Sequence, residues 1–182
     1  MKKSAEFWIK SLQLLEHPEG GYFRESYRSS DNIPDKYLPD RYSTDESHEK
    51  NGSHSFSTCI YYLLKKNQFS ALHRLKSDEI WHYYAGDPVQ LHIIETDGDG
   101  NSNLLKPLLG PDWENKESFQ IAVKSGSWFG GMVVPTGSYC LLGCTVAPGF
   151  EFSDFDLADR RDLLAMFPDY RDVIIRLTKE NQ

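Results

Sequence analysis

The sequence predicts a mainly β fold, a sandwich or barrel of short strands, with one helix before the strands and two after them. Short runs rich in apolar and aromatic residues follow one another from about residue 57 to 146, separated by turn residues, and this spacing is typical of sandwiches and barrels. Aromatic residues make up 13% of the chain, which favours a β protein with a pocket over a coiled coil or a disordered chain. Helical spacing of apolar residues is confined to the two ends.

The N-terminal segment predicts a helix, a turn, a strand and a loop. Residues 4–15 have apolar side chains at helical spacing, and Ser4 can act as the N-cap. The sequence HPEGG (17–21) ends the helix, and residues 22–29 alternate as a strand does. Residues 29–53 are polar and interrupted by prolines, so we expect a long loop there.

The central block and the C-terminal tail complete the predicted domain, which covers residues 1–182. The predicted strands are 57–65, 70–75, 79–86, 88–95, 117–123, 127–134 and 138–146. DGDGN (97–101) predicts a hairpin turn, because glycine accepts a positive φ. In the tail, Asp156 or Asp159 can cap a first helix, Pro168 ends it, and a second short helix follows over 169–177.

Charge and cysteine usage narrow the partners and the location. The chain of 182 residues has a formal net charge of −7, which repels phosphate backbones and anionic lipid, so we expect no nucleic-acid partner and no membrane partner. The apolar run near the N-terminus is broken by Lys10 and Gln13, and no cleavage site of small residues follows it. Three cysteines without CxxC spacing indicate neither a disulfide framework nor a zinc knuckle, and a cytoplasmic location fits best.

The stretch LHRLKSDEIWHYYAGD (72–87) resembles the first motif of the cupin superfamily, in which a pair of histidines is followed by a glutamate and a glycine. His73, Glu79 and Gly86 have the spacing of that motif, and Leu75 stands at the second histidine. The histidine of the second motif falls on Phe129 if KSGSWF (124–129) is aligned, or on Cys140 if PTGSYC (135–140) is aligned; we prefer the first alignment.

Longer strings resemble one branch, the fifth cupin family, long labelled a domain of unknown function. They are HPEGGYFRESYR (17–28), STCIYYLL (57–64), DEIWHYYAGDP (78–88), SGSWFGG (125–131) and GCTVAPGFEFSDFDL (143–157). The resemblance runs from about residue 10 to 177 and implies a double-stranded β-helix, the cupin or RmlC-like jelly roll, with a pocket inside the barrel and a homodimer. Some members are described as predicted sugar epimerases by analogy, without an established reaction.

The resemblance bears on metal binding. A cupin metal site gathers two or three histidines and a glutamate, and of these only His73 and Glu79 remain here. Two ligands hold a divalent ion weakly, so we expect no metal and no cofactor. A divalent metal on His73 and Glu79, completed by His82, is the alternative. Side chains alternate along a strand, which puts His82 on the face opposite Glu79.

Acid–base chemistry needs fewer residues than a metal site. A histidine and a carboxylate in an aromatic pocket can exchange a proton with a bound molecule. We therefore expect His73 as a base, Glu79 beside it, and Tyr83 as an acid. Sugar-nucleotide epimerases of the cupin superfamily pair a histidine with a tyrosine in this way. Tyr61 and Tyr84 are alternatives for the acid.

Other residues are candidates for ligand contacts. Trp81 and Trp128 could stack on a ring, and Ser57 could donate a hydrogen bond. Arg24 and Arg28 share a face of the predicted strand, and an arginine pair near the pocket suits a phosphate or carboxylate. Pairing of these arginines with Glu19, Glu25 or aspartates is the alternative. His17 is expected at a helix end, and His48, His54 and His92 are expected at the surface. The acidic residues of PGFEFSDFD (148–156) are expected in a solvated turn.

The functional expectation is a cupin that binds a polar, anionic small molecule such as a sugar nucleotide. The pocket is expected to contain His73, Glu79, Trp81, Tyr83 and Trp128, with Arg24 at its rim. An isomerase-like or epimerase-like proton transfer is one reading of this site. A non-catalytic ligand-binding or sensing protein is the second reading, and a metal-dependent enzyme is the third.

Overall fold

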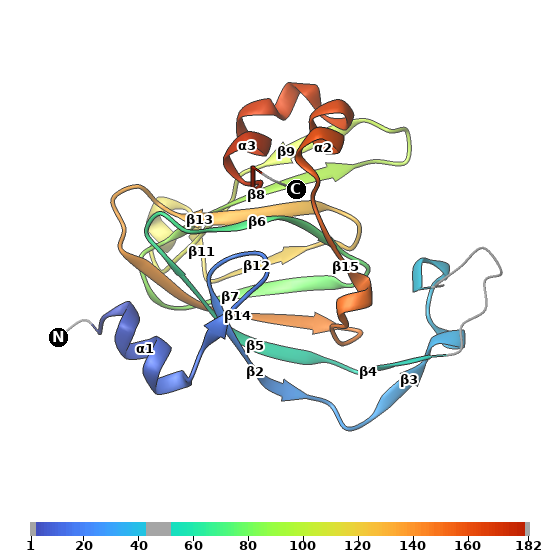
Figure 1. Ribbon diagram of the computed structural model, residues 1–182, viewed down its shortest axis with the longest axis horizontal. Helices are drawn as coiled ribbons and strands as arrows, with labels where there is room; N and C mark the ends of the chain where they lie inside the picture. Colours follow the sequence, from blue (N-terminus) through green and yellow to red (C-terminus); the bar gives the residue numbers. More distant parts are fainter. Residues whose placement is uncertain (1–2, 43–51, 181–182) are drawn as a thin grey trace.

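The computed structural model describes residues 3–42 and 52–180, and two β-sheets that face each other form its centre (Figure 1). The six-stranded sheet has the order β1 (Leu15–Glu16), β2 (Tyr22–Arg28), β5 (Thr58–Lys65), β14 (Tyr139–Ala147), β7 (Asp78–Gly86) and β12 (Gln120–Val123). The seven-stranded sheet has the order β11 (Glu117–Ser118), β10 (Leu108–Leu109), β8 (Val89–Thr96), β13 (Trp128–Val133), β6 (Phe69–Leu75) and β15 (Phe155–Leu157), and β9 (Ser102–Leu105) pairs with β8. β10 and β11 run parallel, whereas the other strand pairs of the described ranges are antiparallel.

Helices flank the sheets at both ends of the chain, so the predicted mainly β fold with terminal helices is confirmed. α1 (Ala5–Leu12) begins after Ser4, whose Oγ accepts a hydrogen bond from an amide of the first turn. α2 (Arg160–Met166) begins after Asp159, whose carboxylate accepts two such bonds. The turn η5 (Pro168–Tyr170) leads into α3 (Arg171–Arg176). No helix in the described ranges is long and apolar enough to cross a bilayer.

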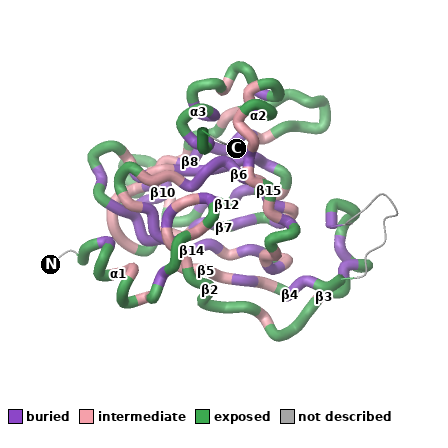
Figure 2. The backbone as a smooth tube through the Cα atoms, in the orientation of Figure 1, coloured by how far each residue is buried: buried purple, intermediate pink, exposed green. Residues whose placement is uncertain are grey.

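Alternation along the strands separates three apolar clusters. Tyr62 and Leu64 of β5 point into the space between the sheets, where the main core lies, while Leu63 faces outward and packs under α1. Leu72 and Trp128 face outward from the seven-stranded sheet and pack against α2 and α3, which cover that sheet in Figure 1. The buried stretches of Figure 2 follow the central strands for this reason.

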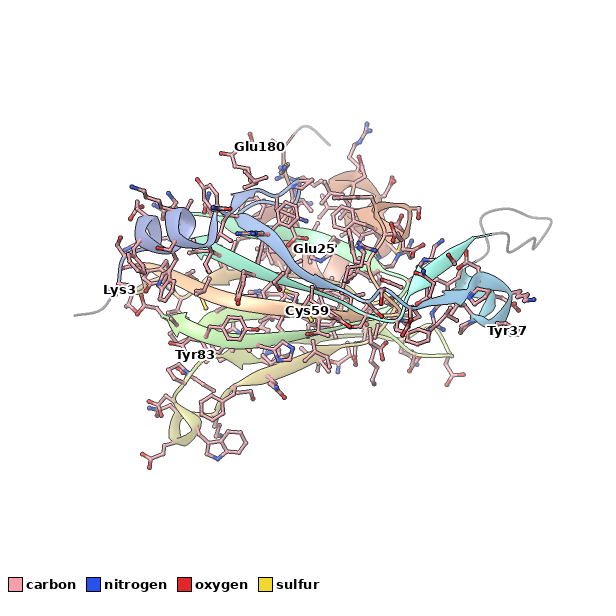
Figure 3. All side chains as sticks on the ribbon, turned by 90° about the horizontal axis from the view of Figure 1, so that it is seen from below. Lys3, Glu25, Tyr37, Cys59, Tyr83 and Glu180 are labelled. Carbon is pink, nitrogen blue, oxygen red and sulfur yellow. The ribbon has the colours of Figure 1, made fainter. Side chains whose placement is uncertain are left out.

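Part of the predicted loop 29–53 is structured. β3 (Asn32–Pro34) pairs with β4 (Ser53–Ser55), and the turns η1 (Asp35–Tyr37) and η2 (Asp40–Tyr42) follow β3. We call residues 32–42 and 52–55 the arm; it extends away from the barrel, with Tyr37 near its end in Figure 3. Residues 43–51, and with them His48, lie outside the described residues. The short strands β9, β10 and β15 were not predicted.

Two histidines expected at the surface are buried. His54 lies in the arm between two aspartates: its Nδ1 is 2.6 Å from Asp35 Oδ1, and its Nε2 is 2.6 Å from Asp154 Oδ2. Burial disfavours its charged form, but the two carboxylates outweigh burial and raise the pKa of His54. His92 of β8 is also buried, and burial lowers its pKa to about 4. Asp154 is the last residue of the turn η4 (Phe152–Asp154) and is buried rather than solvated.

Candidate functional site

A cavity of about 110 Å³ lies between the two sheets at the end where the 148–155 segment returns to β6. Its ionisable lining residues are His17, Glu19, Glu25, Arg28, His73, Glu79, Cys144 and Glu151. Its apolar and neutral lining residues are Phe23, Thr58, Ile60, Leu75, Val146, Phe150, Phe152 and Phe155. The cavity therefore combines an aromatic wall with charged groups.

His73 lies at the buried end of the cavity between two glutamates. It comes from β6 in one sheet, and Glu79 comes from β7 in the other. The Nε2 atom of His73 is 3.9 Å from Glu79 Oε2, and its Nδ1 atom is 3.3 Å from Glu19 Oε2 and donates to the Ala71 carbonyl at 2.7 Å. All three ionisable side chains are less than 9% exposed. The structure thus brings the predicted pair, His73 and Glu79, together.

The electrostatic surroundings keep His73 charged. Burial disfavours the imidazolium, but the negative charges of Glu19 and Glu79 outweigh burial and raise the pKa of His73 to about 9. Since it is protonated at neutral pH, His73 carries a proton on both ring nitrogens, of which Nδ1 donates to the Ala71 carbonyl and Nε2 faces Glu79. Oε2 of Glu79 is buried and has no hydrogen-bond partner among the described residues. Cys144 lines the same region, and burial raises the pKa of its thiol, which makes it a poor nucleophile.

The turn HPEGG supplies two site residues that the sequence prediction missed. Glu19 accepts a hydrogen bond from Ser70 at 2.9 Å, and its backbone carbonyl bonds to the Ala71 amide of β6. Gly20 allows this close approach: its φ is +113°, and a Cβ there would lie 2.2 Å from the Phe69 carbonyl oxygen.

His17 lies on the cavity wall and not at a solvated helix end. It accepts a hydrogen bond from the Glu19 amide at 3.3 Å, and burial lowers its pKa although a glutamate is close. It is therefore neutral at neutral pH. The sequence did contain a signal for these two site residues. His17 and Glu19 lie beside paired glycines, within the string that resembles the cupin family.

A bulge in β2 decides which arginine reaches the cavity. Arg24 lies opposite Tyr61 of β5, but the register shifts between Glu25 and Tyr27, so that Arg28 lies opposite Thr58. Arg28 and Glu25 consequently line the cavity. Arg24 faces outward and donates to the Leu12 carbonyl at 3.1 Å. The predictions that the two arginines share a face, and that Arg24 lies at the pocket rim, are wrong.

Arg28 joins two carboxylates at the mouth of the cavity. It donates to both oxygens of Glu25 at 3.2 and 2.9 Å and to Glu151 Oε1 at 2.7 Å. It also donates to the Phe150 carbonyl at 3.0 Å, which ties β2 to the 148–155 segment. The three charged side chains are 36–43% exposed, in contrast to the buried trio around His73. We call Glu25, Arg28 and Glu151 the mouth trio and Glu19, His73 and Glu79 the inner trio.

Three predicted pocket residues lie elsewhere. Trp81 is buried in the main core, edge-on to Tyr62 at 5.8 Å, and does not line the cavity. Tyr83 lies further along β7, where its hydroxyl donates to the Gly86 carbonyl at 2.9 Å and burial raises its pKa to about 12. Trp128 packs under the C-terminal helices with Arg74 over its ring. These placements are corrections: Trp81 packs in the main core and Tyr83 against it, both away from the cavity, and Trp128 lies on the outward face of the seven-stranded sheet.

The remaining candidates occupy the outer side of the six-stranded sheet. His82 lies on the face opposite Glu79, as predicted, with Nε2 3.0 Å from Thr145 Oγ1 and Nδ1 3.0 Å from Gln120. Tyr84 sits at a second bulge and contacts Tyr61 edge-on at 6.1 Å. Ser57 precedes β5 and is half-buried outside the cavity, whereas the next residue, Thr58, lines it. Figure 3 shows Tyr83 and Cys59 on neighbouring parts of this sheet.

The sequence of this site region matches a known protein family. The family described as cupin superfamily (DUF985) matches residues 6–158, which is most of the chain. The chain belongs to this cupin family.

Three similar proteins cover most of this cupin. A hypothetical protein from Leishmania major superposes with a TM-score of 0.85 at 35% identity, covering 98% of this chain and 100% of that one. Protein SO0799 from Shewanella oneidensis gives a TM-score of 0.79 at 33% identity, covering 97% and 98%. The uncharacterised protein YML079W of Saccharomyces cerevisiae is 28% identical over 167 residues, which cover 86% of this cupin and 76% of the yeast protein.

The donor set of this cupin does not fit a transition metal. A metal on His73 would have to bind Nε2, because Nδ1 donates to the Ala71 carbonyl, and Glu79 is the carboxylate that faces Nε2. Leu75 lines the cavity, and the Phe129 ring lies 4.1 Å from the His73 ring, so the other two motif positions offer no ligand atom. The described residues contain no group of three or more His, Cys, Asp or Glu side chains arranged to hold a metal.

Proposed function

We propose that this cupin binds a small polar molecule in the barrel cavity and transfers a proton within it, in the manner of an isomerase or epimerase. The observation that carries the proposal is the buried pair of His73 and Glu79: an imidazolium beside a carboxylate oxygen that has no hydrogen-bond partner among the described residues. At one site, the base can remove a proton from a substrate while the acid donates a hydrogen bond or a proton to the same substrate.

The roles of the two residues follow from their charges. Glu79 is the base that removes a proton from a carbon next to a carbonyl group, so that the C–H bond breaks and an O–H bond forms on the carboxylate. His73 donates a hydrogen bond to the carbonyl oxygen and stabilises the negative charge that develops there. Glu79 then returns the proton from the same side, either to the same carbon, which gives exchange, or to the former carbonyl carbon. In the second case the hydroxyl proton of the deprotonated carbon passes to the former carbonyl oxygen, which completes an isomerisation. The expected roles of His73 as base and Tyr83 as acid are thereby replaced.

The cavity volume limits the ligand. Pockets for drug-sized ligands have volumes of roughly 300–1,000 Å³, whereas this cavity measures about 110 Å³. A whole sugar nucleotide does not fit inside it, so we propose a molecule of a few non-hydrogen atoms or the end of a larger one. The argument for an anionic ligand also weakens, because Arg24 faces outward and Arg28 is neutralised by two carboxylates.

The proposal is tested by proton exchange. The protein is incubated in D₂O with small hydroxy-carbonyl and amino-carbonyl compounds, and deuterium incorporation at the carbon next to the carbonyl is followed by NMR. We expect incorporation with the wild type, loss with Glu79→Gln and His73→Gln, and no change with His82→Gln, a histidine on the outer side of the sheet. Binding without incorporation by any compound would refute turnover and leave a ligand-binding or sensing protein.

The assembly and the location remain part of the proposal. We expect a homodimer, and exposed aromatics on and beside the six-stranded sheet, among them Tyr84 and Phe119, support such a contact. Light scattering on the purified protein measures its mass. The three cysteines are free, which supports a reducing compartment such as the cytoplasm.

A further inference from the structure

We infer that the ligand of the cavity carries a positive charge, in the form of an ammonium group bound at the mouth. This inference rests on the proposed function, because it names the class of molecule that the same cavity takes. It reverses the sign of the ligand expected from the sequence.

Carboxylates outnumber cationic side chains around the cavity. The inner trio combines two glutamates with one imidazolium, and the mouth trio combines two glutamates with one guanidinium. Each trio therefore has a formal charge of −1 at neutral pH. His17 adds no charge, because burial lowers its pKa. A cavity that is negative at both levels attracts a cation and repels an anion, and the net charge of −7 on the chain acts in the same direction.

The aromatic wall suits an ammonium group as well. Phe150 and Phe152 line the mouth, with ring centroids 5.1 Å apart and planes at 81°. Phe152 is 59% exposed although it is large and apolar. An ammonium group attracts the face of an aromatic ring while it keeps hydrogen bonds to carboxylates. Two rings beside Glu25 and Glu151 offer both kinds of contact at one place.

The inner trio independently indicates that a ligand binds inside the cavity. Glu79 lines the cavity, its Oε2 has no hydrogen-bond partner among the described residues, and the nearest cationic nitrogen is 3.9 Å away. A buried carboxylate oxygen without a donor is costly. A ligand whose charged end is held at the mouth would direct its other end toward this oxygen. The binding end and the reacting end of the ligand are thus separated along the cavity.

The test uses three small probes of similar size and different charge: ethanolammonium, ethylene glycol and glycolate. Each is titrated into the wild-type protein, and the imidazole resonances of His73 are followed by NMR. We expect ethanolammonium to bind about tenfold more tightly than glycolate, or better, with an affinity that falls as salt is added. Glu25→Gln should weaken ethanolammonium about fivefold and leave ethylene glycol unchanged.

Asp156→Asn is the matched control, since Asp156 is an exposed carboxylate paired with Arg74 and is not among the residues that line the cavity. It should leave all three affinities unchanged. If glycolate or ethylene glycol binds at least as tightly as ethanolammonium, the cationic class is wrong and the proposed function stands. If Glu25→Gln weakens all probes equally, charge at the mouth is not the cause of binding, and the inference fails. If none of the probes affects His73, the inference of an ammonium ligand fails, and deuterium exchange decides the proposed function separately.

Discussion

Removing the titrating group at position 73 should change how the stability of the protein depends on pH. The pKa of His73 rises from an ordinary value of 6.5 to about 9 in the folded protein. A rise of that size corresponds to roughly 3 kcal/mol of folding free energy. Because the folded pKa lies above the unfolded one, this contribution is complete below about pH 6.5 and is lost as the pH rises through about 9.

The assay is urea unfolding of the wild type and of His73→Gln at about pH 6 and about pH 9. We expect the difference in unfolding free energy between the two proteins to shrink by roughly 3 kcal/mol over that interval. Taking the difference removes the contribution of His54, whose pKa is also raised. NMR titration of the His73 ring gives the pKa directly. A constant difference, together with a ring that titrates at or below its ordinary value, would refute the proposed imidazolium.

Three further changes test the fold around the site. Gly20→Ala should destabilise the protein by about 2 kcal/mol or more, because a Cβ there meets a backbone carbonyl at 2.2 Å. Gly100→Ala, at φ +85° in open space, should cost only about 1 kcal/mol. Equal losses of unfolding free energy in urea would contradict this. Asp159→Ala should cost about 1 kcal/mol through loss of the α2 cap, and Asp159→Asn should restore most of it in thermal unfolding. His54→Ala removes the ring between two buried carboxylates, of which Asp154 keeps Lys76 as an ion-pair partner, so we expect a loss of about 3 kcal/mol; a value near zero would show that this ring does not stabilise the arm.

Much of the barrel was predictable because its signals are local. Alternation and turn residues delimit β5, β6, β7, β8 and β14, and N-cap chemistry locates the start of α1 and α2. The spacing of His73 and Glu79 indicated that these residues would meet. Each of these features depends on a few consecutive residues, and the structure departs from the predicted bounds by only a few positions.

The wrong predictions concern residues whose positions depend on contacts between segments that are distant in the sequence. The bulge that turns Arg28 inward depends on how β2 pairs with β5, and alternation within β2 alone gives the wrong face. Glu19 reaches His73 only because Gly20 lets its turn approach β6. Trp128 is covered by helices that follow it by some thirty residues. The register between two strands, the close approach of a turn to a strand, and the covering of a strand by helices are set when the barrel assembles. The local sequence pattern therefore does not predict them.

The double hydrogen bond of His54 links the arm mechanically to the rim of the cavity. One ring joins Asp35 in the arm to Asp154, two residues after the side chain of Phe152 at the mouth. Because these buried hydrogen bonds join the two segments, we expect the segments to open together as one cooperative unit of local unfolding. Amide hydrogens of the arm and of the 148–155 segment should therefore exchange with a common opening free energy. A ligand that orders the mouth would then slow exchange far out in the arm, although it touches no residue there.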